Sequence, residues 1–308
     1  MKNYGYTIFI LLIVALGYFF PSTFTEMNGV KLTKLIPYML MLIMFGMGTT
    51  MTKDDFSSIA RNPKGVFVGL LCQFLFMPLI GLTLTKIFSF PPEIAAGVIL
   101  IGASPSGLAS NVMAYIAKAN VALSITITTC ATLMAPILTP FFMKQYGGAY
   151  VEVHFVQMMW DISKTVILPL AIGFAMNLFL SKEFMKKLHV ILPYLSMAGI
   201  GYIILTVTAA GHSSLATVGG MLLIAVLIHN LMGYVLGYFT SRLIFKLPEQ
   251  DARTVAIETG LQNGGLASSL ALQMGKPATV GLAAALFGPL MNLTGSLLSS
   301  YWSRNVPA

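Results

Sequence analysis

Long apolar runs separated by short polar breaks fill the chain. Ten such runs cover residues 5–21, 35–51, 64–86, 92–116, 120–143, 160–180, 190–210, 215–244, 251–274 and 277–302. A helix of about 20 apolar residues crosses about 30 Å of hydrocarbon, so each run predicts one membrane-spanning helix. The runs lack the alternation of membrane β-barrel strands, and lipid requires backbone groups to be paired within the protein. We therefore predict an all-α polytopic membrane protein with ten transmembrane helices.

Composition disfavours a soluble fold. Hydrophobic residues make up 56% of the 308 residues and charged residues only 9%, whereas soluble chains carry about 25% charged residues. The net charge of +8 does not indicate nucleic-acid binding, because Lys and Arg stand singly between the apolar runs. Cys72 and Cys130 lie inside apolar runs without metal-type spacing, which predicts simple packing. No catalytic motif supports an enzyme.

The basic residues predict the orientation in the membrane. Twelve lie on the side of the N-terminus, namely Lys2, Lys53, Arg61, Lys64, Lys118, Lys182, Lys186, Lys187, Arg242, Lys246, Arg253 and Arg304. Six lie on the other side, namely Lys31, Lys34, Lys86, Lys144, Lys164 and Lys276. Cytoplasmic loops carry the excess of Lys and Arg, so both termini are predicted to be cytoplasmic. The first run is interpreted as a helix rather than a signal peptide, and the absence of transit-peptide features favours a bacterial inner membrane.

An internal repeat divides the chain into residues 1–147 and 148–308, each with five predicted spans. The tetrapeptide GLAS at residues 107–110 recurs 158 residues later at 265–268, and a lysine follows each copy at the same offset, Lys118 and Lys276. Both copies fall in the fourth span of their half. Halves with an odd number of spans have opposite orientations, so the pattern predicts an inverted repeat, as in many secondary transporters. The alternative is a chance recurrence of small residues at helix contacts.

Both copies of the repeat interrupt their spans. The first contains GASPSG at residues 102–107 and the second GLQNGG at 260–265. Gly and Pro at this depth loosen a helix and free backbone groups, which are tolerated only inside protein or a wet cavity. Half-helices are predicted to begin near Ser106 and Gly264, and two helix N-termini facing one cavity would favour an anion. The alternative is a pair of kinks that only assist packing.

Glu258 is the one acidic residue, of ten, that lies well inside a predicted span and beside a break. A carboxylate at the bilayer centre costs at least about 2.5–3.5 kcal/mol and therefore needs a partner. Hard oxygen donors that could share a cation with it occur at Gln73, Ser110, Asn111, Ser124, Thr128 and Gln262. No cluster of His or thiolate suggests a transition metal. The alternative is a protonated glutamic acid with a structural or proton-carrying role, whereas His229 has no acidic partner in the sequence and is interpreted as a packed residue.

Three segments carry a resemblance to a known family. Residues 258–267 read ETGLQNGGLA, residues 106–113 and 120–124 read SGLASNVM and NVALS, and residues 42–48 read LIMFGMG. These resemble the corresponding stretches of the bile acid:sodium symporter family, and the first is a highly specific signature. The resemblance extends from about residue 35 to Trp302.

The resemblance implies a fold of ten helices in a panel domain and a core domain. The panel domain would hold spans 1, 2, 6 and 7, and the core domain spans 3–5 and 8–10, with two broken helices crossing in the core. Two sodium ions would lie behind the crossing as coupling ions, with no further cofactor. The resemblance assigns one ion to Ser110, Asn111, Ser124, Thr128 and Glu258, and the other to Gln73, Glu258, Gln262 and the carbonyls of Thr259 and Leu261.

The resemblance also implies an organic-anion site in front of the crossing. Its candidate residues are Ser106, Gly107, Leu108, Ala109, Asn263, Gly264, Gly265, Met291 and Asn292. Relatives often have Thr at position 108, Ser at 264 and Trp-His-Asn where this chain has residues 290–292, LMN. These departures leave fewer side-chain donors, so backbone N–H groups would hold more of the anion. They favour a small pantoate- or 2-oxo-acid-like carboxylate over a bile acid.

The function expected from the sequence is therefore sodium-coupled symport of an organic anion by alternating access. We expect a monomer in the lipid bilayer whose partners are sodium and the anion. Two alternatives stay open: a proton-coupled carrier that uses Glu258, and a membrane ligand-binding protein that does not transport.

Overall fold

The protein is described by a computed structural model that covers residues 5–304, and its side chains are described from Ile8 onward. Lys2, which contributes to the predicted orientation, and the two chain ends lie outside the described residues. The helices of the first half are α1 Gly5–Phe19, α2 Pro21–Thr25, α3 Ile36–Thr50, α4 Lys53–Arg61, α5 Pro63–Leu71, α6 Met77–Phe88, α7 Pro92–Ala103, α8 Ala109–Ile116 and α9 Val121–Phe142. Those of the second half are α10 Phe155–Ile162, α11 Leu168–Phe179, α12 Lys182–Ala210, α13 His212–Phe239, α14 Glu249–Gly260, α15 Gly264–Gln273 and α16 Leu282–Arg304.

Several helices are joined by π-helical turns into longer rods. These turns lie at Cys72–Phe76, Met143–Gly147, Ser163–Ile167 and Thr240–Ile244, and a 3₁₀ turn at Leu32–Leu35 precedes α3. The strands β1 Glu26–Met27 and β2 Val30–Lys31 form a small antiparallel hairpin. Asn28 and Gly29 both have positive φ there, as a tight two-residue hairpin turn requires.

Within residues 5–304, seven helical segments are long and apolar enough to cross a membrane. They are Leu32–Thr50, Pro63–Phe88, Val121–Gly147, Phe155–Phe179, Lys182–Ala210, His212–Ile244 and Leu282–Arg304, and two shorter apolar helices are Ile8–Phe19 and Pro92–Ala103. The predicted fold class, a helical protein with many membrane spans, is confirmed.

Two helix boundaries differ clearly from the predicted runs. Helix α12 begins at Lys182 rather than at residue 190, because Ser181 caps its first turn by accepting a hydrogen bond from the Phe184 backbone N–H (3.3 Å). The first residues of α12 include several charged side chains, so they were not counted in the apolar run that predicted this helix. Helix α16 begins at Leu282 rather than at 277, because hydrogen-bonded turns precede it, such as that from the Val280 N–H to the Lys276 carbonyl (3.0 Å).

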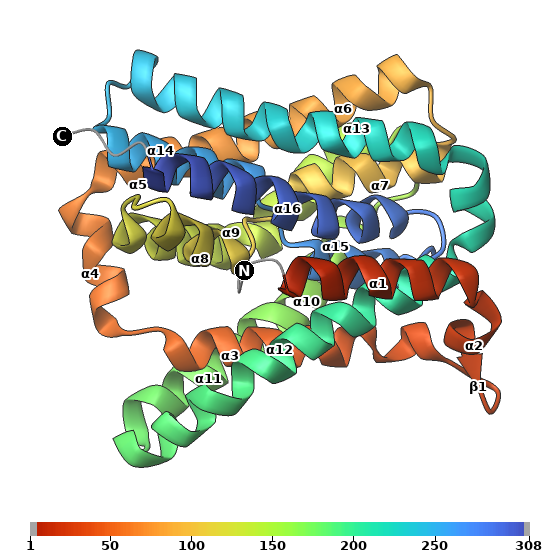
Figure 1. Ribbon diagram of the computed structural model, residues 1–308, viewed down its shortest axis with the longest axis horizontal. Coiled ribbons are helices and arrows are strands. Elements are labelled where there is room, and N and C mark those ends of the chain that lie inside the picture. Colours follow the sequence, from red (N-terminus) through yellow and green to blue (C-terminus); the bar gives the residue numbers. More distant parts are fainter. Residues whose placement is uncertain (1–4, 305–308) are drawn as a thin grey trace.

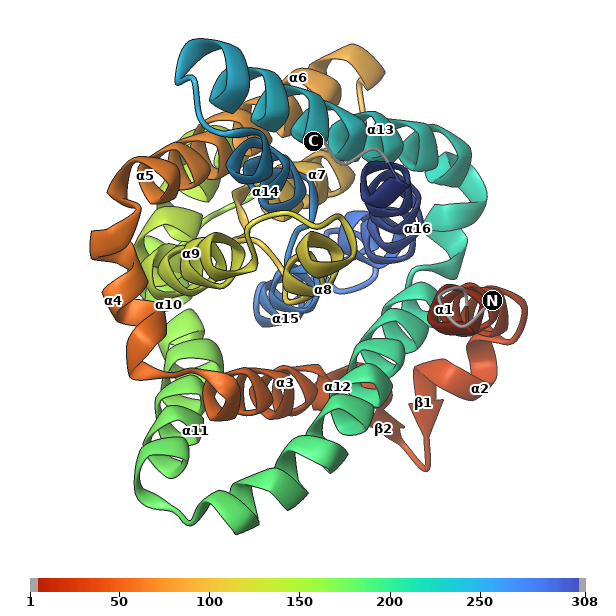
Figure 2. The ribbon, with the colours of Figure 1, turned by 60° about the vertical axis from the view of Figure 1, so that its left-hand side comes forward.

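The helices form two groups (Figures 1 and 2). Helices α1, α3, α11 and α12 lie together as one layer, and α5, α6, α7, α9, α13, α14 and α16 pack around α8 and α15. Helix α4 connects α3 of the first group to α5 of the second, and its Phe56 packs against Phe174 of α11 with ring centroids 5.4 Å apart. The chain passes between the two groups several times, and α4 is one of these connections.

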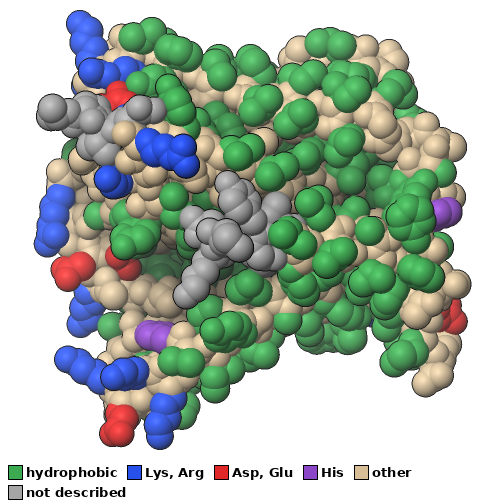
Figure 3. Space-filling view, in the orientation of Figure 1, with side chains coloured by type: hydrophobic (Ala, Val, Ile, Leu, Met, Phe, Trp, Pro, Cys, Tyr) green, Lys and Arg blue, Asp and Glu red, His purple; other side chains and the backbone are tan. Residues whose placement is uncertain are grey.

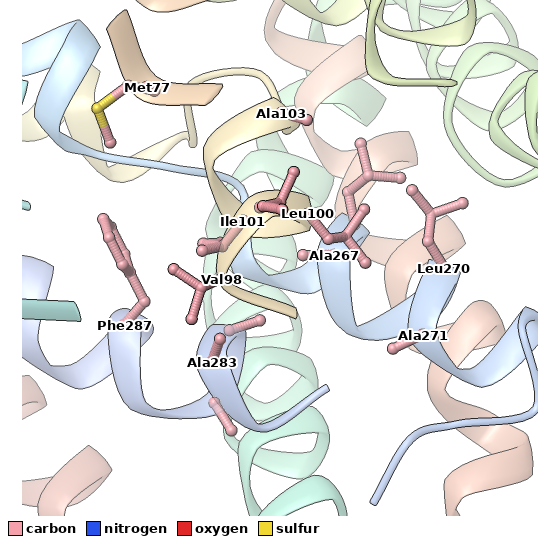
Figure 4. Close-up of a cluster of buried hydrophobic side chains, with 14 of the residues drawn as sticks. Met77, Val98, Leu100, Ile101, Ala103, Ala267, Leu270, Ala271, Ala283 and Phe287 are labelled. Atoms are coloured by element: carbon pink, nitrogen blue, oxygen red, sulfur yellow. The ribbon is translucent and has the colours of Figure 1, made fainter. Parts of the chain in front are cut away.

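Small side chains allow α7, α15 and α16 to pack closely in the second group (Figure 4). Ala103, Ala267, Ala271 and Ala283 belong to this cluster, which also contains larger aliphatic residues. A Cβ at Gly97 of α7 would lie 2.4 Å from the Val280 carbonyl oxygen, so only glycine permits that approach. Such contacts are typical of membrane helices, where packing replaces the hydrophobic effect.

Charged side chains gather at one end of the molecule. On the face seen in Figure 3, Lys and Arg concentrate at the left-hand end, where α4, α5 and α14 lie in Figure 1, and hydrophobic side chains cover the middle. This distribution agrees with spans that run along the long axis of the view.

Candidate functional site

Both predicted interruptions are present, and the two broken segments contact each other directly. Helix α7 ends at Ala103 and α8 begins at Ala109, while α14 ends at Gly260 and α15 begins at Gly264. The extended residues between them pair as an antiparallel bridge, Ser106 opposite Gln262. The Gly107 N–H donates to the Leu261 carbonyl (2.9 Å), and the Asn263 N–H donates to the Pro105 carbonyl (2.8 Å). The bridge therefore satisfies backbone groups that the breaks would otherwise leave unpaired.

The start of the first half-helix differs from the prediction. Helix α8 begins at Ala109, three residues after Ser106, because Ser106 and Gly107 are held extended in the bridge. The second half-helix begins at Gly264 as predicted, and the Asn263 side chain caps it by accepting from the Leu266 N–H (3.0 Å).

Five side chains with oxygen donors form one buried cluster behind the bridge. The Glu258 carboxylate accepts from the Ser124 hydroxyl and from the Thr128 hydroxyl, the latter at 2.8 Å. Asn111 Oδ1 lies 2.9 Å from Ser124 Oγ, and Ser110 Oγ lies 3.2 Å from Thr128 Oγ1. The structure thus brings together, from α8, α9 and α14, all five residues that the resemblance assigns to one ion.

Glu258 is fully buried in this cluster, with 0% of its surface exposed. Among residues 5–304 it takes part in no ion pair, and no group of three or more His, Cys, Asp or Glu side chains surrounds it. Hydrogen bonds from hydroxyl groups do not neutralise a buried carboxylate, which needs a cation or a proton as its partner. The donor set consists of hard oxygen atoms, which suits an alkali or alkaline-earth cation.

The second predicted ion set contains a reciprocal amide pair. Gln73 Nε2 donates to Gln262 Oε1 (2.7 Å), and Gln262 Nε2 donates back to Gln73 Oε1 (3.1 Å). Gln262 Nε2 also donates to the Thr259 carbonyl (2.6 Å), while the Leu261 carbonyl accepts from Gly107. Gln73 lies in the π-helical turn at Cys72–Phe76, a distortion that is frequent at functional sites. The four residues therefore lie together at the end of α14.

Replacing Gln73 by leucine is expected to lower the free energy of unfolding by about 1–3 kcal/mol, because the buried Gln262 Oε1 loses its donor. The Ser104 carbonyl loses the Gln73 Nε2 donor (2.8 Å) as well. The measurement is the thermal midpoint in detergent. Gln157→Leu is the control, since Gln157 is exposed and donates to Asp161 on the same helix (2.9 Å). Equal midpoints for the two variants would contradict the prediction.

A cavity of about 450 Å³ lies in front of the bridge, between the two helix groups. Eight of the nine predicted organic-anion residues line it: Gly107, Leu108, Ala109, Asn263, Gly264, Gly265, Met291 and Asn292. Ser106 does not, because its side chain turns into the interior at the bridge, where only 1% of its surface is exposed. The placement of Ser106 at the cavity surface is therefore not supported.

The opposite wall of the cavity was not anticipated from the sequence. It is formed by residues of α3 and α12, among them Leu40, Met44, Ser196, Met197 and Ile200. Apolar residues on a membrane helix carry no sequence signal that separates a cavity wall from a lipid-facing surface. Most of the lining is hydrophobic, and no Lys or Arg contributes to it among the described residues.

Side-chain contacts that were not predicted from the sequence cap the C-terminal ends of α7 and α14. The Gly260 carbonyl at the end of α14 accepts from Asn230 Nδ2 of α13 (2.8 Å), just as Gln73 caps the Ser104 carbonyl after α7. Asn230 is in turn fixed by the Thr294 hydroxyl, which donates to its Oδ1 (2.6 Å). The two breaks are thus stabilised in the same way by a side-chain amide from a neighbouring span.

Side-chain contacts also hold the N-terminal ends of α7 and α14 in place. Asp251 in the first turn of α14 accepts from Asn62 and Asn120, both at 2.8 Å, and Asn120 follows α8. Glu93 in the first turn of α7 pairs with Lys276, which follows α15. Glu93 and Asp251 are separated by the same 158 residues as the GLAS copies, a signal that could have identified both contacts. The start of α14 is therefore attached to the loop that follows α8, and the start of α7 is attached to the loop that follows α15.

His229 matches its interpretation as a packed residue. It is fully buried, its Nε2 lies 2.9 Å from the Met77 carbonyl, and its ring packs edge-on against Phe287. No acidic group contacts it among residues 5–304.

Comparison with known proteins places this architecture among transporters. The sequence profile of the Sodium Bile acid symporter family matches residues 37–218. The chain is 36% identical to the uncharacterized sodium-dependent transporter YocS of Bacillus subtilis, over 97% of this chain and 91% of that protein. It is 34% identical to the human ileal sodium/bile acid cotransporter, over 81% of this chain and 72% of that protein.

Two further matches extend the range of relatives. The probable chloroplastic sodium/metabolite cotransporter BASS1 of Arabidopsis thaliana is 34% identical, over 87% of this chain and 66% of that protein. The structure of the sodium/proton antiporter MjNhaP1 of Methanocaldococcus jannaschii matches with a TM-score of 0.59 and 13% identity, over 96% of this chain and 90% of that chain. At that identity the likeness concerns the fold alone.

Proposed function

The chain belongs to the sodium bile acid symporter family, a family of sodium-dependent transporters and integral membrane proteins, and from this premise we propose that it is a sodium-coupled symporter of an organic anion. The observation that carries the proposal is the fully buried Glu258, which has no ion pair among the described residues and lies among oxygen donors where two helices are broken. A transported cation is the partner that this carboxylate lacks.

Two sodium ions are proposed as co-transported substrates. The first is bound by Ser110, Asn111, Ser124, Thr128 and Glu258, whose oxygen atoms already lie within hydrogen-bonding distance of one another. The second is bound by Gln73, Glu258, Gln262, Thr259 and Leu261, where the oxygens of the reciprocal amide pair turn from each other to the ion. Carbonyls of unwound membrane helices commonly coordinate sodium in secondary transporters.

The proposed architecture is ten membrane spans in two inverted repeats, residues 1–147 and 148–308. Spans 1, 2, 6 and 7 form the panel domain and spans 3–5 and 8–10 the core domain. The matching amide caps on the two breaks and the reciprocal ties of Glu93 and Asp251 support this symmetry. The gathering of basic residues at one end supports cytoplasmic termini, here in a bacterial inner membrane, with the chain active as a monomer.

The organic anion is proposed to bind in the 450 Å³ cavity between core and panel. Its carboxylate would lie near the start of α15 and Asn263, where the positive end of the helix dipole favours an anion. Its apolar body would contact α3 and α12, whose lining residues are largely hydrophobic. The departures from the family favour a small acid, whereas the volume and this lining favour an amphipathic carboxylate over an acid as compact as a 2-oxo acid, and we propose the amphipathic carboxylate.

Sodium binding is proposed to come first and to order the bridge, so that the anion binds more tightly. The core then moves against the panel and exposes the cavity to the other side of the membrane. Two sodium ions with one monovalent anion move one net positive charge inward, which yields about 2.3 kcal/mol per 100 mV of membrane potential.

The test is uptake into proteoliposomes of a panel of acids that includes a bile salt, pantoate and pyruvate. An inward sodium gradient is expected to drive uptake of at least one of them, and the bile salt is expected to compete more strongly than pyruvate because it fills the cavity. Uptake that follows a pH gradient and ignores sodium would select a proton-coupled carrier. Binding without sodium-driven flux would select a protein that does not transport.

A further inference from the structure

A second cavity, of about 390 Å³, lies where α11 ends and α12 begins. It is lined by Asn177, Leu180, Lys182, Met185, Lys186, His189 and Val190. None of these residues lines the organic-anion cavity or belongs to either proposed ion site. Figure 1 places this junction of α11 and α12 at the lower left of the view, at the end where Figure 3 shows blue Lys and Arg side chains.

The cavity has a basic rim without acidic partners in its lining. Lys182 and Lys186 are one turn apart on α12, so their side chains extend over the same face. Both are exposed, and neither forms an ion pair with any residue in the described part of the chain. Lys187 follows them, and Glu183 is the single acidic residue in this stretch of α12. The local charge therefore favours an anionic ligand.

The floor of the cavity is fixed by hydrogen bonds to the end of α3. His189 Nε2 lies 2.9 Å from the Thr49 carbonyl, and Asn177 Nδ2 donates to the Met51 carbonyl (2.8 Å). These two bonds hold the polar side chains at the base in place. The lysines at the rim remain available to a ligand.

Exposed apolar side chains occur in the same stretch of chain as the basic rim, at the end of α11 and in the first turns of α12. Phe179 is 84% exposed, Val190 63%, Ile191 54% and Phe184 48%. In a membrane protein such side chains on the outside of a helix contact acyl chains. A positive rim beside an acyl-chain surface matches an anionic phospholipid, which carries a phosphate and hydrocarbon in one molecule, and a free phosphate would use only the rim.

We propose that this cavity, formed by the α11–α12 junction, binds the headgroup of an anionic phospholipid, with Lys182 and Lys186 contacting its phosphate. The inference goes beyond the proposed transport function and does not depend on it. A lipid held here would stabilise the α11–α12 junction against the end of α3, where α4 begins the connection to the other helix group.

The test compares binding of phosphatidylglycerol and phosphatidylcholine to the purified full-length chain by native mass spectrometry. Lys182→Gln/Lys186→Gln is expected to weaken phosphatidylglycerol binding about 25-fold, at about fivefold for each lysine, and to leave phosphatidylcholine binding unchanged. The matched control is Lys31→Gln/Lys34→Gln, which removes two exposed lysines close together in sequence, one in β2 and one in the 3₁₀ turn that follows it. This control should bind phosphatidylglycerol within twofold of the wild type.

Three results would overturn the proposal. They are equal affinity of the wild type for the two lipids, an equal loss in the two double variants, and binding of inorganic phosphate that displaces the lipid completely. An unchanged thermal midpoint of Lys182→Gln/Lys186→Gln in neutral detergent shows that the variant is folded, so that its lipid affinity is informative. Failure of sodium-driven uptake in the wild type would count against the proposed transport function and leave this measurement valid.

Discussion

Replacing Glu258 by glutamine is expected to abolish protection by sodium and sodium-driven uptake in a protein that still folds. Glutamine keeps the shape of the side chain but removes the negative charge that a buried cation requires. Its amide oxygen accepts from one of the two hydroxyls, of Ser124 or Thr128, and its N–H donates to the other, which reverses that bond. Removing one partner of a buried charge pair costs about 3–5 kcal/mol, which is a loss of more than about a hundredfold in sodium affinity. In choline, the variant should be at least as stable as the wild type, since an unpaired buried carboxylate is gone.

The measurement is the thermal midpoint in detergent with sodium against choline, followed by uptake in proteoliposomes. Glu152→Gln is the matched control, because Glu152 is largely exposed and contacts His154 at the surface. It should retain full sodium protection. Sodium protection of Glu258→Gln equal to that of the wild type would eliminate the proposed ion sites.

The second large effect is expected at Gly107. A Cβ there would lie 2.7 Å from the Gln262 carbonyl oxygen, a contact with backbone that no side-chain rotation relieves. Gly107→Ala should force the two extended segments apart and weaken the bonds from Gly107 to Leu261 and from Asn263 to Pro105. We expect a loss of about 1–3 kcal/mol in stability, as for other overpacked sites, together with the loss of sodium protection, because the bridge positions both ion sets.

Gly265→Ala is the control for this change, since it lies at the equivalent position of the second GLAS copy. A Cβ at Gly265 would meet its nearest atoms at 3.5 Å, which is an ordinary contact. Because Gly265 lines the organic-anion cavity, the comparison uses sodium protection rather than uptake. Similar behaviour of the two variants would mean that the bridge is not required for sodium binding.

The sequence predicted the elements whose cause is local. Long apolar runs identified the membrane helices, and Gly and Pro located both breaks, which the structure places at residues 104–108 and 261–263. Glu258 was recognisable because placing a charged carboxylate in lipid is energetically unfavourable, so one inside an apolar run indicates a functional site. Oxygen donors such as Ser124 and Thr128 were noted as candidates from the residues, and the resemblance added their assignment to two separate ions.

The features that the sequence did not predict depend on how helices distant in the sequence pack against one another. The wall of the cavity formed by α3 and α12 is apolar, like every other surface of a membrane helix, so its position became visible only when the helices were packed. Asn230, which caps the Gly260 carbonyl, is one polar residue in a long apolar span. The start of α8 at Ala109 rather than at Ser106 follows from pairing with Gln262, a residue far away in the sequence.

The ties between the broken helices restrict which parts of the molecule are able to bend. Segments 92–116 and 249–273 are joined at their breaks by the bridge and at their outer ends by the contacts of Glu93 and Asp251. Neither segment has freedom to slide or rotate without the other. Under the proposed function, the articulation must therefore lie in the connections between the two helix groups, at α4, at residues 148–154 and at Gly211, and stiffening these three places would slow turnover without altering ion affinity.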